Sequence, residues 1–273
     1  MQSTGIAKYI LRFVHSLTWW CIIVGATGRS KGNRVAKGVE SSSAMAWRCG
    51  GRTNRELVAN LANSKIITNK LTEAAMLGTD RKMYVPKQFE KNAYDDNPLP
   101  LGLGATISAP HMHAYALDWL APVITETSNI LDVGSGSGYL TACFARMAEG
   151  GQAFGIDHID TLVQSSIENV KRDDASLLDS GRVVLQVVDG FDGLEEHGPY
   201  DAIHVGAAAP SIPQVLVKQL SKGGRMVIPV GPENGAQEIF MVDKDSDGKV
   251  SQQAILGVRY VPLTSKAHQL SRA

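Results

Sequence analysis

The feature that most constrains the fold of this chain is the regular alternation of strand-like and helix-like segments that begins near Asn129. Five short apolar runs are separated by stretches of helical length, and they occupy residues 130–133, 153–156, 183–188, 202–205 and 226–230. Runs of this length are typical of buried strands. Strands that alternate with helices form a mostly parallel sheet with helices packed on its faces. We therefore predict an α/β fold for this part of the chain.

The segments before this alternation are predicted to be helical. Apolar side chains recur through residues 54–77 at spacings that indicate two short helices, and Thr53 is placed to cap the first. Pro110 suits the first turn of a further helix that continues to Leu120. The first two helices are interpreted as an N-terminal helical addition to the sheet.

The last part of the chain differs, because its apolar runs are joined by a turn. Residues 238–242 and 255–261 flank the turn-rich segment 243–248, which predicts an antiparallel hairpin at the sheet edge. Before this hairpin, Gly223 and Gly224 are expected to cap the end of a helix and to lead into a strand. The role of this glycine pair is therefore predicted to be architectural.

Length and composition limit the number of domains and the kinds of partner. A chain of 273 residues fits one α/β domain with an appendage. Lys and Arg together number 27, as do Asp and Glu, so the chain has no global positive field to hold nucleic acid or an anionic membrane. The three cysteines form no Cys-x-x-Cys pair, which argues against a zinc ribbon or a disulfide framework and fits a reducing compartment. No metal site is predicted.

Residues 1–44 are excluded from the predicted fold. This segment begins with basic residues and no acid, and its apolar stretch from Leu17 to Ala26 is shorter than the roughly 20 residues that a membrane-spanning helix needs. The composition indicates a targeting segment for an organelle or for secretion, or else a disordered tail upstream of an alternative start at Met45. We therefore predict an extension over 1–44 and a domain over 45–273, with no stable membrane span.

A glycine turn follows the first predicted strand and is the strongest local sign of a ligand site. Residues 130–138 read Ile-Leu-Asp-Val-Gly-Ser-Gly-Ser-Gly, and glycines there let a ligand approach the backbone closely. A dinucleotide site needs Gly-x-Gly-x-x-Gly, whereas this turn is Gly-x-Gly-x-Gly after Asp132, whose negative charge opposes phosphate. The turn therefore fits an amino-acid ligand better, although a tight turn without a ligand has the same local form.

Acidic residues also follow the next two predicted strands. Asp157 lies 23 residues beyond Gly134, near the spacing of about 20 expected for a carboxylate that accepts hydrogen bonds from both hydroxyls of a ribose. His158 either packs against an adenine or is a strand-end histidine without a role. Asp189 and Gly190 offer a carboxylate and a backbone amide to the adenine amino group and a ring nitrogen.

Four stretches carry a resemblance to a known family. Residues 105–113, 131–138, 199–210 and 261–264 read ATISAPHMH, LDVGSGSG, PYDAIHVGAAAP and VPLT. They closely resemble protein-L-isoaspartate O-methyltransferases, and the resemblance runs from about Met45, where Met-Ala-Trp resembles the usual start of the animal cytosolic form. It implies a Rossmann-like methyltransferase fold with S-adenosyl-L-methionine as the cofactor.

The resemblance also implies the residues of the site. The expected cofactor contacts are Ala105, Thr106, Ile107, Ser108, His113, Asp132, Gly134, Gly136, Ser137, Asp157, His158, Asp189, Gly190, Thr264 and Gln269. Among them, Ser108 stands at the family's active-site position. Two positions depart from the family, because Val188 stands where glycine is usual and Phe191 where arginine is common. The adenine contacts are therefore matched less closely than the rest.

The reaction implied by the resemblance is methylation of the free carboxylate of L-isoaspartyl and D-aspartyl residues in damaged proteins and peptides. The α-carboxylate of an isoaspartyl residue has a pKa of about 3.5 and is ionised at neutral pH, so no general base is required. We expect the hydroxyls of Thr106 and Ser108 to hold this carboxylate as catalytic groups. The alternative is that they bond to the start of the helix at Pro110. We further expect a cytoplasmic monomer that binds no nucleic acid.

Three other classes of function stay open at this point. An NAD-dependent oxidoreductase is supported by the glycine turn and Asp157, but the third glycine is wrongly spaced. A methyltransferase that acts on an adenine or amide nitrogen usually carries Asn/Asp-Pro-Pro-aromatic after the fourth strand, where residues 204–210 read His-Val-Gly-Ala-Ala-Ala-Pro. The third is a non-catalytic adaptor that retains cofactor binding.

Overall fold

The computed structural model describes residues 49–271, so the predicted extension over 1–44, with its apolar stretch Leu17 to Ala26, and the domain boundary at Met45 lie outside the described residues. The α-helices are α2 (Asn54–Asn63), α3 (Lys70–Gly78), α4 (Pro110–Leu120), α5 (Tyr139–Met147), α6 (Asp160–Asp174), α7 (Ser176–Asp179), α8 (Gln214–Gln219) and α9 (Lys266–Leu270). The strands are β1 (Leu99–Gly102), β2 (Ala105–Ile107), β3 (Asn129–Val133), β4 (Gln152–Asp157), β5 (Val183–Val187), β6 (Tyr200–Val205), β7 (Leu220–Val230), β8 (Gln237–Lys244) and β9 (Val250–Val258). Short 3-10 helices are η1 (Arg81–Tyr84), η2 (Lys87–Asn92), η3 (Ala121–Val123) and η4 (Glu195–His197).

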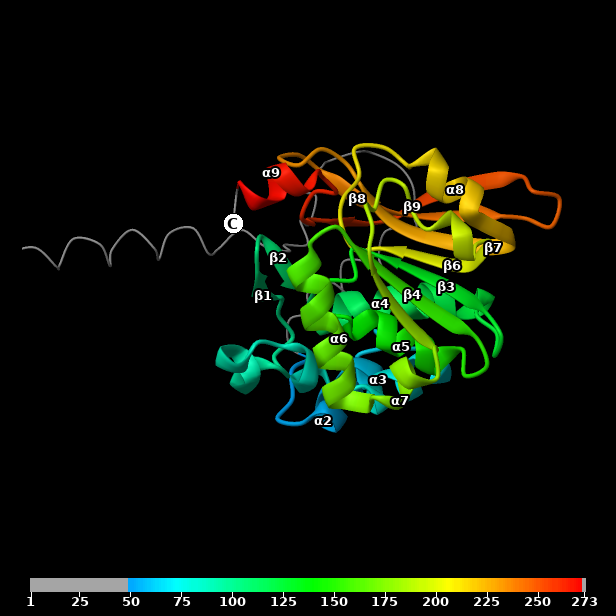
Figure 1. Ribbon diagram of the computed structural model, residues 1–273. Helices are drawn as coiled ribbons and strands as arrows, with labels where there is room; N and C mark the ends of the chain where they lie inside the picture. The colour runs from blue at the N-terminus through cyan, green and yellow to red at the C-terminus, as the bar shows by residue number, and fades with distance from the viewer. Residues whose placement is uncertain (1–48, 272–273) are drawn as a thin grey trace, which may run out of the picture.

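A seven-stranded sheet forms the centre of the molecule, with the strand order β5-β4-β3-β6-β7-β8-β9 (Figure 1). The first five strands in this order are parallel, and β8 and β9 add an antiparallel hairpin at one edge. The chain moves outward from β3 to β5 and then returns to the other side of β3 with β6, so the strand order reverses between β3 and β6. The predicted α/β class, with a mostly parallel sheet and an antiparallel edge hairpin, is confirmed.

Alternate residues of the inner strands enter two hydrophobic cores. Ile130 and Ala153 pack on the face that α3, α4 and α5 cover, whereas Leu131 and Phe154 pack on the opposite face with side chains of α8. Full burial of a large apolar side chain contributes about 1.5 to 3 kcal/mol. Because both faces are packed, the carboxyl ends of β3 and β6 are held in fixed positions.

The predicted N-terminal helices are present, and both begin at a side-chain cap. The Thr53 hydroxyl accepts a hydrogen bond from the Glu56 amide at 3.2 Å, which confirms the predicted cap of α2. Asn69 caps α3 by accepting from the Leu71 amide at 2.8 Å. A cap of this kind contributes about 1 kcal/mol. Each of the two helices therefore begins directly after a polar capping residue, where apolar side chains start to recur at helical spacing.

The predicted helix cap at the glycine pair is wrong, because both glycines lie in a strand. Helix α8 ends at Gln219, and Gly223 and Gly224 lie inside β7, where the pairing with β6 shifts its register. A side chain at Gly224 would come within 2.9 Å of the Asp201 carbonyl oxygen. Glycines inside a strand often mark such a bulge, and the same pair at a helix end would cap it. The local sequence fits both structures, and only the pairing with β6 decides between them.

A short antiparallel hairpin, β1–β2, precedes α4 and was not predicted. It pairs Leu99 with Ile107 and Pro100 with Thr106, and Leu103 in its turn has a positive φ of 52°. Three- and four-residue strands are too short to show a clear alternation in the sequence. The hairpin leads directly into α4 and thereby fixes the backbone on both sides of Ser108.

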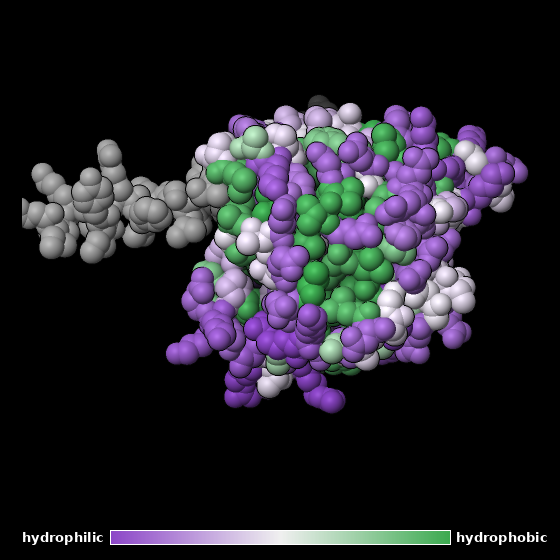
Figure 2. All heavy atoms as spheres, viewed as in Figure 1, coloured by the Kyte–Doolittle hydropathy of each residue, from purple (hydrophilic) through white to green (hydrophobic). Residues whose placement is uncertain are grey.

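The strand β5 forms the edge of the sheet opposite the hairpin. Val187 and Phe191, at and just beyond its end, are 48% and 37% exposed. Figure 2, which has the same view as Figure 1, shows a group of apolar side chains beside α6.

None of the helices between residues 49 and 271 is both long and apolar enough to cross a membrane.

Candidate active site

The loops that follow β3 and β6 meet where the strand order reverses, and each begins with a glycine. The Gly206 amide donates a hydrogen bond to the Val133 carbonyl at 2.8 Å, so the two loops lie against each other. Gly134 has a φ of +76°, and a side chain built on it would meet no atom closer than 3.9 Å. Ligands of open α/β sheets bind at this switch point, outside the carboxyl ends of the strands. Gly134 therefore leaves open a cradle at the place where a ligand is expected.

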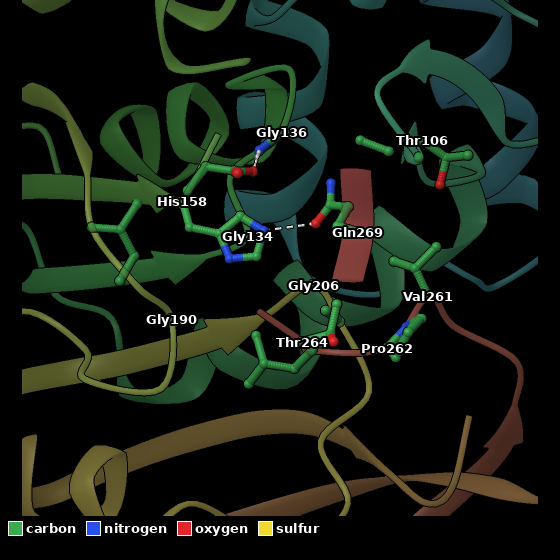
Figure 3. A pocket seen from close by; sticks show the side chains of 16 residues that line it. Thr106, Gly134, Gly136, His158, Gly190, Gly206, Val261, Pro262, Thr264 and Gln269 are labelled. Atoms are coloured by element: carbon green, nitrogen blue, oxygen red, sulfur yellow. Dashed lines mark hydrogen bonds between the residues drawn. The ribbon is translucent and has the colours of Figure 1, made fainter. Parts of the chain in front are cut away.

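A cavity opens beside Gly134 and forms the larger compartment of the candidate site (Figure 3). It encloses about 870 Å³, including the part open to solvent. Its lining residues come from the end of β4, from the loops after β3, β4, β5 and β6, from the β1–β2 hairpin and from the C-terminal segment; they are Gly104, Ala105, Thr106, Gly134, Gly136, Ile156, Asp157, His158, Gly190, Gly206, Ala207, Val261, Pro262, Leu263, Thr264 and Gln269.

Asp157 lies at the end of β4 and lines this larger compartment. Its Oδ2 accepts a hydrogen bond from the Gly136 amide at 3.3 Å, and its Oδ1 accepts one from the Ile159 amide at 3.0 Å. Burial raises the pKa of Asp157 above its ordinary value, although the two amide hydrogen bonds lower it. Each carboxylate oxygen has a second lone pair, so the group can accept further hydrogen bonds from a ligand.

The C-terminal helix α9 closes one side of the larger compartment through Gln269. The Gln269 amide nitrogen donates to the Leu103 carbonyl at 3.0 Å, and its Oε1 lies 2.7 Å from the His158 Nε2 (Figure 3). Because the amide oxygen can only accept, His158 donates from Nε2. The predicted residues His158 and Gln269, which are far apart in the sequence, are therefore in direct contact.

A smaller compartment adjoins the larger one and shares Thr106, Gly134, Gly136 and Gly206 with it. Its remaining lining residues are Ile107, Ser108, His113, Asp132, Ser135, Ser137, Leu140 and His204. The two compartments therefore adjoin at Gly134. A ligand seated in the larger compartment therefore has its inner end close to the hydroxyls of the smaller one.

The hydroxyls of Thr106 and Ser108 are available to a ligand. Neither forms a side-chain hydrogen bond with any residue between 49 and 271, and the N-cap position of α4 is Ala109, which has no side-chain cap. The amide of His111 in the first turn is instead satisfied by the Asp96 carboxylate at 2.9 Å. The alternative, in which the two hydroxyls bond to the helix start, is therefore not observed.

His113, in the first turn of α4, also lines the smaller compartment. It is 7% exposed, and its ring lies 5.0 Å from that of Tyr139, measured between centroids. Burial lowers the pKa of His113 well below its ordinary value, and the nearby charge of Arg81 lowers it further. The imidazole is therefore neutral at physiological pH.

His204 is a residue of the smaller compartment that was not predicted as a site residue. It follows from the register of the sheet, because Asp132 on β3 and His204 on β6 are direct pairing partners. Its Nδ1 lies 2.8 Å from Asp132 Oδ1, and both side chains are buried. Asp132, which was predicted to contact the cofactor, therefore lines the smaller compartment beside His204.

The structure leaves one predicted residue outside both compartments. The Asp189 carboxylate accepts a hydrogen bond from the Phe191 amide at 3.0 Å, whereas Gly190 lines the larger compartment. Val188 packs against the core on the α8 side of the sheet, so the two departures from the family pattern flank this turn without lining the site. The predicted contact between Asp189 and an adenine stays a prediction.

The segment Val261 to Leu263 also lines the larger compartment and was not predicted as part of the site. In the sequence, this segment was singled out only because residues 261–264 resemble the family. Pro262 forms a parallel bridge with Ala208, and the Leu263 amide donates to the Ala208 carbonyl at 2.8 Å. This long-range pairing brings the C-terminal segment over the loop after β6. No local pattern in the sequence indicates such a pairing.

The fold and the site together define a class of protein. A doubly wound sheet with an antiparallel edge hairpin, a glycine turn after β3 and a carboxylate after β4 make up the Rossmann-like fold of S-adenosylmethionine-dependent methyltransferases. The profile of one family, described as Protein-L-isoaspartate(D-aspartate) O-methyltransferase (PCMT), matches residues 52–268. The chain belongs to this family.

Individual relatives agree with this assignment. Protein-L-isoaspartate O-methyltransferase 1 of Arabidopsis thaliana is 49% identical over 219 residues, which cover 80% of this chain and 94% of the relative. The protein-L-isoaspartate O-methyltransferase of Caenorhabditis elegans is 43% identical over 229 residues, which cover 84% of this chain and all of the relative. A Plasmodium falciparum chain described as a protein-L-isoaspartate O-methyltransferase, solved in complex with S-adenosyl-L-homocysteine, superposes with a TM-score of 0.71 at 34% identity, covering 78% of this chain and 99% of that one.

Family membership decides between most of the alternatives. Its members are named as O-methyltransferases, which argues against an oxidoreductase and against a nitrogen methyltransferase. A non-catalytic adaptor would share the same fold and cavity. The named relatives are methyltransferases, so the chain is assigned to the enzymes of the family.

Proposed function

We propose that this chain is a protein repair enzyme that moves a methyl group from S-adenosyl-L-methionine to the free carboxylate of L-isoaspartyl and D-aspartyl residues in damaged proteins and peptides. The observation that carries the proposal is the junction of the two compartments at Gly134, with the Asp157 carboxylate on one side and the Thr106 and Ser108 hydroxyls on the other. Family membership supports it, as does the S-adenosyl-L-homocysteine bound to the Plasmodium falciparum relative.

The residues of the larger compartment fit the cofactor. Asp157 has free lone pairs for two ribose hydroxyls, and the cradle at Gly134 is open to the amino-acid part, because no side chain fills it. Gly190, His158 and Gln269 line the region left for the adenine. When bound, S-adenosyl-L-methionine supplies a methyl group on a positively charged sulfur.

The smaller compartment fits the methyl acceptor. A substrate carboxylate is already ionised at neutral pH and needs no base, so the protein must orient one oxygen toward the methyl and exclude water. The hydroxyls of Thr106 and Ser108 donate hydrogen bonds to the carboxylate without neutralising it. The backbone amide nitrogen of the following residue then displaces methanol from the ester to form a succinimide. Water opens this ring either to normal aspartate, which repairs the site, or back to isoaspartate, which is a substrate again.

Transfer of a labelled methyl group to an isoaspartyl peptide, compared with its normal aspartyl twin, tests the proposed function. We expect label to enter the isoaspartyl peptide in a base-labile form and the twin to stay unlabelled. Equal labelling of the two peptides would contradict the proposed substrate. Binding of S-adenosyl-L-homocysteine without any transfer would identify a non-catalytic adaptor.

We further propose that the protein works as a monomer in the cytoplasm. The separated cysteines and the balanced charge support a reducing compartment and a free enzyme. A fluorescent fusion of the full chain, compared with one that starts at Met45, tests the compartment. Uptake of only the full chain by an organelle or by the secretory route would assign residues 1–44 to targeting.

Sedimentation of the purified chain tests the proposed monomer. A mass twice that of one chain would contradict the proposal.

A further inference from the structure

The side chain of Arg81 in η1 is fully buried although it carries a charge. It is 0% exposed, forms no ion pair with any residue of the described part, and its Nε has no hydrogen-bond partner there. Burial lowers the pKa of Arg81 to about 10, which leaves the guanidinium charged at neutral pH. The nearby Asp96 carboxylate favours the charged form but forms no ion pair with Arg81, so burial of the guanidinium still costs free energy. The guanidinium therefore contributes less to stability than an ion-paired arginine would.

The contacts of Arg81 lead to the smaller compartment. Its Nη1 lies 3.4 Å from the Nδ1 of His113, and its Nη2 donates to the Asn97 carbonyl at 3.3 Å. The guanidinium carbon stands 5.8 Å from the centroid of the Tyr139 ring, on which the His113 ring also packs. Arg81 lines neither compartment itself. Any effect of its charge on a ligand therefore acts through His113.

The chemistry of the contact fixes the proton of His113. A guanidinium has only donor groups, so His113 must accept the hydrogen bond at Nδ1. A neutral imidazole with a bare Nδ1 carries its proton on Nε2. None of the residues from 49 to 271 forms a hydrogen bond with Nε2 of His113. The ring nitrogen left for a ligand is therefore a donor.

We propose that Arg81 is a positioning residue of the smaller compartment, where the methyl acceptor binds. Arg81 holds His113 as a neutral Nε2–H donor for the carboxylate of the substrate. This inference rests on the proposed function, because the carboxylate is the ligand that uses the donor. Nε2–H then adds a third hydrogen bond to those of Thr106 and Ser108. Because His113 stays neutral, it orients the carboxylate without pairing with its charge and so leaves the oxygen able to attack the methyl group.

The first experiment observes the proton directly in the full chain without substrate. The ¹⁵N spectrum of histidine-labelled protein separates bare from protonated ring nitrogens, and the signals of His113 are assigned by their loss in His113→Gln. We expect a bare Nδ1 and a protonated Nε2 at neutral pH. A protonated Nδ1, or an imidazolium, would overturn the proposal whatever the enzyme methylates.

The second experiment removes the guanidinium by Arg81→Met, with Arg146→Met as the matched control. Arg146 is also mostly buried and bonds to Asp173 at 3.0 Å, but it does not contact His113. Arg81→Met should lower kcat/KM for an isoaspartyl peptide by about 10- to 100-fold, the loss expected when an orienting contact is removed. Affinity for S-adenosyl-L-homocysteine should change less than about threefold, and Arg81→Lys should recover part of the activity. The ¹⁵N signals of His113 should move in Arg81→Met and stay in place in Arg146→Met.

The third experiment applies even if Arg81→Met does not fold. The amide nitrogen of Gln reaches the position of Nε2, whereas Asn reaches only that of Nδ1. His113→Gln should therefore retain at least about tenfold more kcat/KM than His113→Asn, as expected when one oriented donor is kept. Equal losses in the two variants, or Arg81→Met activity equal to that of the Arg146→Met control, would overturn the proposal. Absence of methyl transfer by the wild-type protein would instead overturn the proposed function.

Discussion

The Nδ1 of His204 donates a hydrogen bond of 2.8 Å to Oδ1 of Asp132, and the two residues are direct pairing partners on the parallel strands β6 and β3. The other carboxylate oxygen of Asp132 accepts from the Thr141 hydroxyl at 2.6 Å. Both oxygens are thus engaged within the protein. Asp132 was predicted to contact the cofactor; it lines the smaller compartment beside His204, and each of its oxygens keeps a second lone pair, so the contact stays a prediction.

Removal of the Asp132 carboxylate should destabilise the protein. Asp132→Ala leaves two buried donors, on His204 and Thr141, without an acceptor, and each unsatisfied buried group costs about 1 to 3 kcal/mol. We expect the free energy of unfolding in urea to fall by about 2 to 4 kcal/mol. Thr141→Val removes only one of the donors and should cost about 1 kcal/mol, while Thr141→Ser, which keeps the hydroxyl, is the control. An Asp132→Ala protein as stable as the wild type would mean that this network does not form.

The affinity for the cofactor should depend on Asp157. Two charge-assisted hydrogen bonds to ribose hydroxyls are worth about 1.5 to 3 kcal/mol each, so Asp157→Ala should weaken binding of S-adenosyl-L-homocysteine by about 100-fold or more. Calorimetric titration measures this change. Asp179→Ala, which removes an exposed carboxylate of α7, is the control and should leave the affinity unchanged. An Asp157→Ala affinity within twofold of the wild type would remove this residue from the site.

The same carboxylate should give the stability of the ligand-free protein a defined pH dependence. Burial raises the pKa of Asp157, so the folded state holds the proton more tightly than the unfolded state. The stability that this group contributes is present below its unfolded pKa of about 3.8 and is lost as the pH rises through the folded pKa. Asp157→Asn cannot ionise and avoids this loss.

The difference in free energy of unfolding between Asp157→Asn and the wild type should therefore shift in favour of the variant between about pH 4 and pH 7. The size of the shift is about 1.4 kcal/mol for each pKa unit by which the folded value exceeds the unfolded one. Urea unfolding at several pH values measures it, with Asp179→Asn as the control. A shift toward the wild type as the pH rises would show that the pKa of Asp157 is lowered in the folded protein.

The local sequence was sufficient to predict the parts of the site that follow strand ends. The alternation of apolar runs located β3 and β4, and the positions of Gly134 and Asp157 followed, because the carboxyl ends of neighbouring parallel strands share one edge of the sheet. The same reasoning extends to Gly206 after β6, but it needs the strand order, which the sequence pattern does not contain.

Other parts of the site depend on contacts that no local pattern encodes. Arg81 reaches His113 from a different element, and Val261 to Leu263 reach the larger compartment by pairing with the loop after β6. Isolated arginines and short apolar segments are common in all proteins, so their type and spacing carry no signal. Gly223 and Gly224 illustrate the same limit, since one glycine pair suits a helix cap and a strand bulge equally well.

Ser108 is expected to orient the substrate and to form no covalent intermediate. Its hydroxyl lines the smaller compartment without a partner in the described structure, and no nucleophile-elbow pattern surrounds it. An ionised carboxylate attacks the methyl group directly, so methyl transfer should be a single in-line step. Ser108→Ala should then lower turnover on an isoaspartyl peptide by roughly 10- to 1000-fold, the range expected when one oriented donor is lost, while the affinity for S-adenosyl-L-homocysteine stays nearly intact. Ser165→Ala, on the exposed side of α6, is the control and should leave both quantities unchanged. Unchanged turnover in Ser108→Ala, or a methylated Ser108 trapped in the wild-type protein, would contradict this role, because the first result would make the hydroxyl dispensable and the second would make it an acceptor.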